Sequence, residues 1–142
     1  MRLALDHARA AAEQGEVPVG AVIMRGDQVV AVAGNAMRQG HDPTAHAEIA
    51  AIRMACTAIG NQRLTDCDLW VTLEPCAMCA AAIAQARIDR LYYAASDPKG
   101  GGVEHGPRIF ASEGCNHIPE IYSGIGEGEA SAILKAFFAE RR

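Results

Sequence analysis

Two cysteines three residues apart follow a proline in the stretch TLEPCAMCAA, residues 72–81. Cys76 and Cys79 lie at the expected start of a helix, where their sulfur atoms share one face and the helix dipole favours the metal-binding thiolate. Taken alone, such a pair is also typical of a redox-active disulfide or of half of a structural four-ligand zinc site. The chemistry of the pair therefore depends on the residues that complete it.

His46 and Glu48, in the segment TAHAEIAA at residues 44–51, can complete the pair. One histidine and two cysteines leave the fourth zinc position to water, as in catalytic zinc sites and not in structural ones. Residues two apart in a regular helix point to nearly opposite sides, so we expect His46 to lie at the helix mouth. Zinc lowers the pKa of a bound water from about 15.7 to about 7, and the Glu48 carboxylate is available to accept its proton.

The composition limits the classes of protein to which the chain can belong. Its 142 residues are 21% charged and 50% apolar, which is ordinary for a globular protein of one domain spanning residues 1–142. The formal net charge of -4 argues against binding long duplexes, so no DNA partner is expected. The longest apolar run, residues 76–84, is too short for a membrane span. An odd cysteine count and the lack of a secretory signal favour a cytoplasmic location.

Apolar periodicity predicts the helices that would position these ligands. The second is expected to start at Thr44, capped by Asp42 or Thr44 itself, and to bury the stripe Ala45, Ile49, Ile52, Cys56 and Ile59. Glu74 and Pro75 are expected to end a strand, with Pro75 presetting the first turn of the third helix. The four predicted helices cover residues 2–14, 44–59, 76–87 and a C-terminal segment whose stripe is Ala130, Ile133, Leu134, Phe137 and Phe138.

Short β-branched and aromatic runs predict the strands. Two of them flank residues 25–27 and indicate an antiparallel hairpin, and two more lie at residues 68–73 and 89–95. The region 103–126 is weakly patterned, with a short helix expected near Pro107 and a strand near Glu120. This order of elements predicts a three-layer α/β arrangement in which the connections after the hairpin are helical crossovers.

The two motifs together carry a resemblance to a known family. HAE at 46–48 and PCAMC at 75–79 give H-x-E followed by P-C-x-x-C, which is an established signature of the zinc-dependent nucleobase deaminases. The stretches EVPVGAV at 16–22, HDPTAHAEI at 41–49 and VTLEPCAMCA at 71–80 are similar to the bacterial tRNA adenosine deaminases of the TadA type, within the cytidine deaminase superfamily. Residues 100–102 and VEHGPRIF at 103–110 differ from the commoner form of that segment.

The resemblance implies a fold, a reaction and partners. It implies a cytidine deaminase-like α/β/α sandwich with a five-stranded mixed sheet in the order 2-1-3-4-5, and a homodimer. The implied reaction is hydrolytic deamination of the wobble adenosine in a tRNA anticodon stem-loop to inosine by a zinc-activated water. His46, Cys76 and Cys79 would bind one Zn²⁺ per subunit and Glu48 would move protons. Substrate contact is implied for Asn35, and RNA contact for Asp97, Lys99, Phe138, Arg141 and Arg142.

Other functions remain open at this point. A deaminase of a free base or nucleotide, such as guanine or cytosine, would use the same zinc core. A structural zinc site would need a fourth ligand, such as Cys67 or Cys115, and would suit a non-enzymatic interaction domain. A redox pair would need only Cys76 and Cys79.

Overall fold

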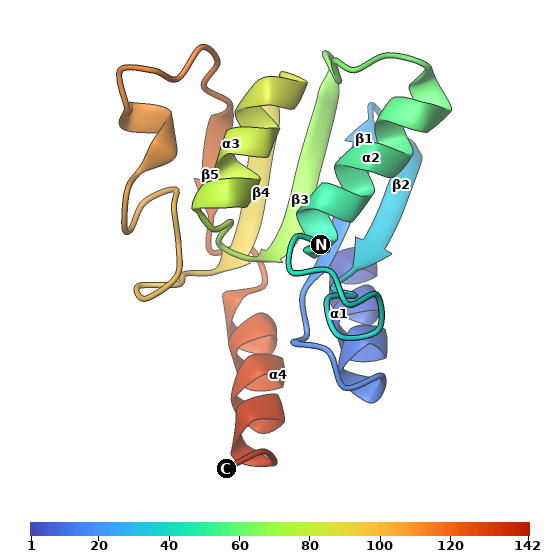
Figure 1. Cartoon of the computed structure of the whole chain (residues 1–142), viewed down its shortest axis with the longest axis vertical. Helices are drawn as coiled ribbons and strands as arrows, with labels where there is room; N and C mark the ends of the chain where they lie inside the picture. Colours follow the sequence, from blue (N-terminus) through green and yellow to red (C-terminus); the bar gives the residue numbers. More distant parts are fainter.

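A mixed five-stranded sheet in the order β2-β1-β3-β4-β5 forms the centre of the computed structural model, which describes residues 1–142 (Figure 1). β1 pairs antiparallel with both β2 and β3, whereas β3, β4 and β5 are parallel. The order and the hairpin that begins it confirm the predicted topology. The strands are β1 (Gly20–Arg25), β2 (Gln28–Gly34), β3 (Cys67–Leu73), β4 (Arg90–Ala95) and β5 (Glu120–Ser123).

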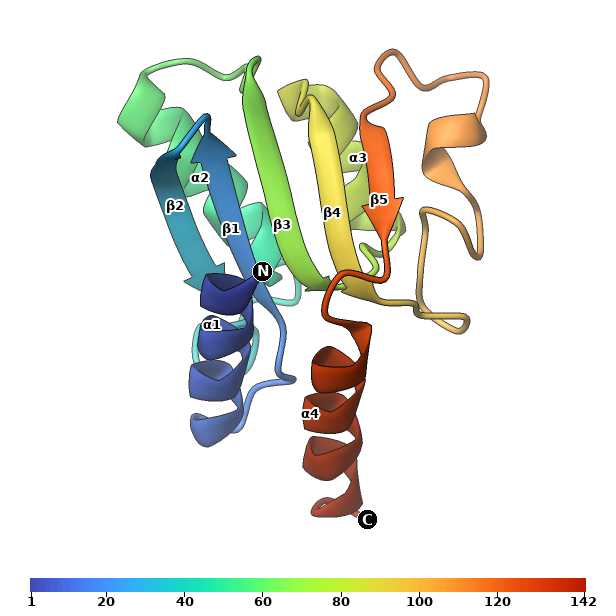
Figure 2. The ribbon, with the colours of Figure 1, turned by 180° about the vertical axis from the view of Figure 1, so that it is seen from behind.

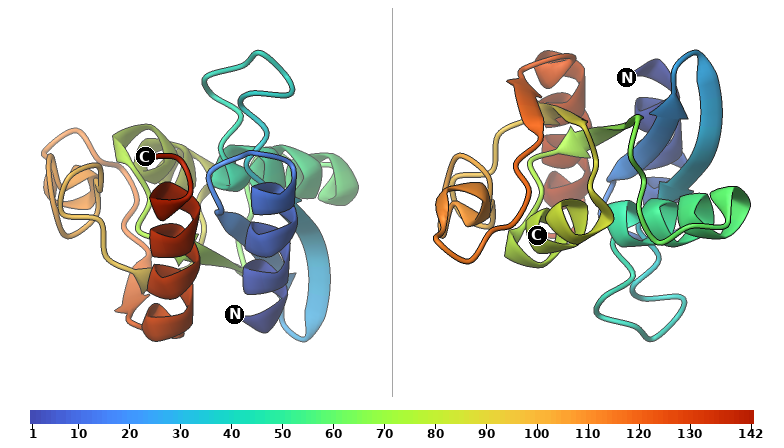
Figure 3. Two further views of the ribbon diagram at one scale, coloured as in Figure 1. Left: turned by 90° about the horizontal axis from the view of Figure 1, so that it is seen from below. Right: turned by 90° about the horizontal axis from the view of Figure 1, so that it is seen from above.

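Helices cover both faces of the sheet, as the three-layer prediction requires (Figure 2). α2 and α3 lie together on one face, and α1 and α4 lie on the other, as the views along the sheet show (Figure 3). None of these helices combines the length and the hydropathy that a bilayer-spanning segment requires. The helices are α1 (Arg2–Glu13), α2 (Ala47–Ile59), α3 (Ala77–Ala86) and α4 (Glu127–Ala139), and a short 3-10 helix, η1, covers Ile109–Ala111.

Small residues let the helices approach the sheet closely. A β-carbon at Gly20 on β1 would lie 2.0 Å from the carbonyl oxygen of Ala4 on α1, so no larger residue fits there without moving the helix. The face that α2 buries is also made of alanines, Ala47, Ala51 and Ala55, together with Glu48. Close packing of this kind places the helix backbones, and hence the residues at their first turns, at fixed positions over the sheet.

The stripe predicted for α2 is less buried than expected, although Ile52, Cys56 and Ile59 do pack against the core. Ile49, Ile52 and Ile59 are only half-buried, whereas the fully buried positions of α2 are the three alanines and Glu48. On α4, Ala130 and Phe137 are buried as predicted, whereas the ring of Phe138 is 48% exposed.

Helix starts and one connection also differ from the predictions. α2 begins at Ala47 rather than at Thr44, and the carboxylate of Asp42 instead accepts hydrogen bonds from the Thr44 N–H and hydroxyl groups within the preceding turn. Pro75 precedes the N-cap of α3, which is Cys76, and so lies outside the first helical turn. The connection from β4 to β5, residues 96–119, is an irregular segment containing only η1, not a helical crossover.

Candidate active site

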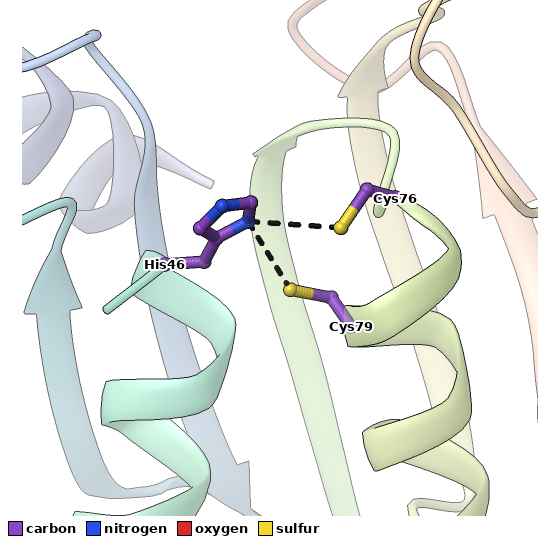
Figure 4. Close-up of side chains that lie close together, drawn as sticks. All are labelled: His46, Cys76 and Cys79. Carbon is purple, nitrogen blue, oxygen red and sulfur yellow. Dashed lines mark hydrogen bonds between the residues drawn. The ribbon is translucent and has the colours of Figure 1, made fainter. Parts of the chain in front are cut away.

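The backbone at the starts of α2 and α3 brings His46, Cys76 and Cys79 together (Figure 4). His46 and Cys76 are the N-cap residues of the two helices, and both have extended backbones, with ψ angles of 151° and 175°. The expectation that His46 lies at the helix mouth, before the helix becomes regular, is confirmed. Cys79 lies in the first turn of α3 and is fully buried.

The spacing of the three side chains fits a tetrahedral metal ion. The Nδ1 atom of His46 is 3.6 Å from the Cys76 sulfur and 3.5 Å from the Cys79 sulfur. Zinc–sulfur and zinc–nitrogen bonds of about 2.3 and 2.0–2.1 Å at a tetrahedral angle would separate nitrogen and sulfur by about 3.6 Å. The three residues therefore fit a zinc ion with one position left for another ligand.

The composition of this group argues against a closed structural metal site. His46, Cys76 and Cys79 are the only three residues of metal-binding type whose ligand atoms gather in this way, all within 4.8 Å of one another. Cys67 and Cys115 do not join them. No fourth residue of metal-binding type completes a four-ligand structural site here.

Hydrogen bonds among His46, Cys76 and Cys79 shift the pKa values of these side chains. The hydrogen bond with Cys79 lowers the pKa of the Cys76 thiol to about 4, against the effect of burial. The same hydrogen bond raises the pKa of Cys79, and the hydrogen bond with Cys76 raises the pKa of His46. Metal binding requires the deprotonated ligands and displaces such protons.

Glu48 lies beside the three residues, in the wall of one cavity. The cavity measures about 250 Å³, and His46, Glu48 and Cys76 all contribute to its lining. The Glu48 side chain is buried, and burial raises the pKa of its carboxyl group to about 7. The structure thus places a buried carboxylate beside the metal-binding group and within reach of a molecule in the cavity.

Asn35 links the cavity wall to the start of α2. Its Oδ1 atom accepts a hydrogen bond from the N–H group of Ala47 at 2.8 Å, and its Nδ2 atom donates to the carbonyl oxygen of Val17 at 3.1 Å. Asn35 thereby pairs the first N–H group of the helix, which has no partner within the helix. Asn35 is also one of the residues that line the cavity.

The residues predicted to contact RNA fall into two groups. Asp97 lines the cavity, and its Oδ1 atom accepts hydrogen bonds from the N–H groups of Lys99 and Gly100. Three others lie at the far end of α4 and do not line the cavity (Figure 1). Among these, Arg141 is held over the ring of Phe137, with its guanidinium carbon 3.5 Å from the ring centre. The three residues are Phe138, Arg141 and Arg142.

The hydrogen bonds of two buried glutamates, Glu16 and Glu74, were not predicted from the sequence, and Glu74 lines the cavity. Oε1 of Glu16 accepts hydrogen bonds from the N–H groups of Arg38 and Gln39, and Glu74 accepts several from residues 97–105. Burial raises the pKa of Glu74, but these hydrogen bonds outweigh it and hold the pKa below its ordinary value. The sequence signal for Glu74 was its position at the end of a buried strand, next to Pro75 and two residues before the metal-binding Cys76.

Comparison with known proteins places the chain among deaminases. All residues, 1–142, match the family model described as MafB19-like deaminase. A relative named tRNA-specific adenosine deaminase, from Agrobacterium fabrum, is 58% identical over 142 residues, which span this whole chain and 93% of the relative. Another of that name, from Rickettsia bellii, is 47% identical over 144 residues and is matched over 99% of its length.

Solved structures agree with the fold and differ in substrate. One, from a study of A-to-I editing by tRNA deaminases at the wobble position of transfer RNA, is 58% identical with a TM-score of 0.93, over 94% of this chain and 97% of that one. A guanine deaminase from Bacillus subtilis is 30% identical with a TM-score of 0.65, over 99% of this chain and 90% of that one.

Proposed function

The chain belongs to the family of MafB19-like deaminases, and from that premise we propose that it is a hydrolase that converts the wobble adenosine of tRNA to inosine. The observation that carries this function is the group His46, Cys76 and Cys79 beside the buried Glu48, in a chain 58% identical to a tRNA-specific adenosine deaminase along its whole length. We infer the substrate and the reaction from the relatives, and we assign the residues that catalyse the reaction from the lining of the cavity.

His46, Cys76 and Cys79 would hold one zinc ion in each subunit, because their spacing matches tetrahedral coordination. When bound, zinc supplies a Lewis acid that makes water nucleophilic near neutral pH. The three side chains and Asn35, which pins the first N–H group of α2, fix the position of that chemistry relative to Glu48. His46 and Cys76 line the cavity, where the base would lie.

Glu48 moves the protons of the reaction. It accepts a proton from the attacking water and gives it to ring atom N1 of adenine, while the water oxygen bonds to C6. Glu48 then passes the remaining hydroxyl proton to the exocyclic amino group, and the C6–N bond breaks to release ammonia. One water is consumed, and the base becomes hypoxanthine, the base of inosine.

The substrate must present its adenine outside a base stack. The C6 atom of an adenine stacked inside an RNA helix cannot reach a cavity of this kind. The substrate must therefore be a nucleotide turned outward from an RNA loop. A few contacts to one hairpin loop are sufficient, which makes the net charge of -4 compatible with an RNA substrate. Asp97 lines the cavity, and the exposed Lys99 donates its backbone N–H group to the Asp97 carboxylate, so we assign both to the neighbouring nucleotides.

The proposed function also includes an oligomeric state and a location in the cell. We assign residues 1–142 to a single deaminase domain that forms a homodimer in the cytoplasm. The family model that matches the whole chain supports the domain, and five free cysteines are compatible with a reducing compartment. Sedimentation of the purified protein tests the dimer.

An assay with two kinds of substrate tests the reaction. The zinc-loaded protein is incubated with an anticodon stem-loop bearing a wobble adenosine and, separately, with free adenine, guanine and cytosine. Inosine in the stem-loop and no ammonia from the free bases is the expected result. The fold is shared with a guanine deaminase, so ammonia from free guanine alone would instead establish a free-base deaminase.

A further inference from the structure

The carboxylate of Glu74 collects hydrogen bonds from one irregular segment of the chain. Its side chain is fully buried. Oε1 accepts from the backbone N–H groups of Val103, Glu104 and His105 at 3.2, 2.9 and 3.0 Å. Oε2 accepts from the N–H group of Asp97 at 2.9 Å and lies 2.8 Å from Nδ1 of His105. Five polar groups from residues 97–105 thus meet a single carboxylate.

This convergence replaces regular secondary structure. Residues 97–105 contain no helix or strand, so their backbone N–H groups must find partners outside a ladder or a helix. A carboxylate has two oxygens with about four acceptor positions, which suits several donors at once. Burial of the Glu74 charge is tolerated because those positions are filled.

The run Gly100–Gly102 is explained by the same arrangement. A β-carbon at Gly101 would lie 2.5 Å from the carboxyl carbon of Glu74, and one at Gly102 would lie 2.5 Å from the backbone nitrogen of Ala77 on α3. The glycines let the segment pass close to the carboxylate on one side and the start of α3 on the other. The segment is therefore shaped by Glu74.

The shaped segment forms part of the cavity wall. Asp97 and Gly100 line the cavity together with Glu74 itself, beside His46, Glu48 and Cys76. We propose that Glu74 is a positioning residue that holds residues 97–105 in the form that receives the nucleotide, and so determines substrate affinity rather than metal binding or proton transfer. The inference rests on the proposed function for its substrate, but its structural half can be measured without any substrate.

Glu74→Gln tests both halves. The amide nitrogen of glutamine donates and cannot accept, so either the bond from the Asp97 N–H group at Oε2 or the three bonds at Oε1 must be lost. Backbone N–H groups of residues 97 and 103–105 should exchange with solvent deuterium at least about tenfold faster than in the wild type. KM for the stem-loop should rise by about tenfold or more, the effect of losing one charge-assisted hydrogen bond. kcat should stay within about twofold, and zinc content should be unchanged.

A matched substitution at another buried glutamate is the control. Oε1 of Glu16 accepts two backbone hydrogen bonds while its Oε2 has no partner, so glutamine can keep both bonds there. Glu16→Gln should leave deuterium exchange in residues 97–105 at the wild-type rate. Glu74→Asp keeps the charge with a shorter reach and should give an intermediate KM.

Three outcomes overturn the inference: unchanged exchange in residues 97–105, a fall in kcat with KM unchanged, or loss of zinc. If Glu74→Gln does not fold, Gly101→Ala keeps the carboxylate but displaces the same segment, because its β-carbon would lie 2.5 Å from the Glu74 carboxyl carbon, and it should give the same rise in KM with zinc retained. A wild-type protein that leaves the stem-loop unmodified would refute the proposed function. Faster exchange in Glu74→Gln would in that case still support the role of Glu74 in holding residues 97–105.

Discussion

Replacing Asn35 by alanine should destabilise the protein by an amount that the structure sets. The Asn35 side chain is 7% exposed and pairs two backbone groups, the N–H of Ala47 and the carbonyl of Val17. A buried polar group left without a partner costs about 1–3 kcal/mol. Two such groups give about 2–6 kcal/mol, and water entering from the cavity reduces the cost. We therefore expect the free energy of unfolding to fall by about 2–4 kcal/mol.

Urea unfolding at equal zinc loading measures this loss, and Asn35→Asp serves as the control. Aspartate keeps an acceptor for the Ala47 N–H group, and its negative charge is favourable at a helix N-terminus, but it cannot donate to Val17. It should therefore recover about half of the loss. An alanine variant within about 0.5 kcal/mol of the wild type, or an aspartate variant no better than alanine, would show that Asn35 does not pin the start of α2.

Three further changes test other parts of the structure. Cys79→Ser should reduce bound zinc from one ion per chain to a small fraction, measured by metal analysis after dialysis, because a serine hydroxyl is a far weaker zinc ligand than a thiolate; full retention would remove Cys79 from the site. Gly20→Ala should lower the melting temperature sharply, since its β-carbon would lie 2.0 Å from the Ala4 carbonyl oxygen, and an unchanged melting curve would contradict that packing. Lys99→Ala should weaken stem-loop binding and reduce the slope of log affinity against log salt by about one, while an unchanged slope would argue against a phosphate contact.

The metal-binding group was predictable from local sequence because its members are fixed by short motifs. Cys76 and Cys79 are held by one turn of helix, and the two-residue spacing of His46 and Glu48 required an extended backbone at His46, which the structure has. The strand order came from the family resemblance and was confirmed.

The features that were wrong or missed depend on contacts between distant parts of the chain. The start of α2 was misplaced because the group that pairs its first N–H is Asn35, twelve residues upstream, and not the nearby Asp42. The burial of the α2 stripe was overestimated, because the fully buried positions of that helix are the neighbouring alanines and Glu48. The role of Glu74 could not be predicted because its hydrogen-bond partners lie more than twenty residues away in an irregular segment.

The most direct test of the account is the rate of a single turnover by Glu48→Ala on the wobble-adenosine stem-loop, with zinc measured in the same sample. Positioned proton transfer contributes about 10²–10⁴-fold to the rate of such reactions. We therefore expect inosine formation to slow by at least about 10²-fold while one zinc ion per chain is retained. Wild-type inosine formation by the zinc-loaded variant would contradict the assignment of Glu48 as the group that moves protons.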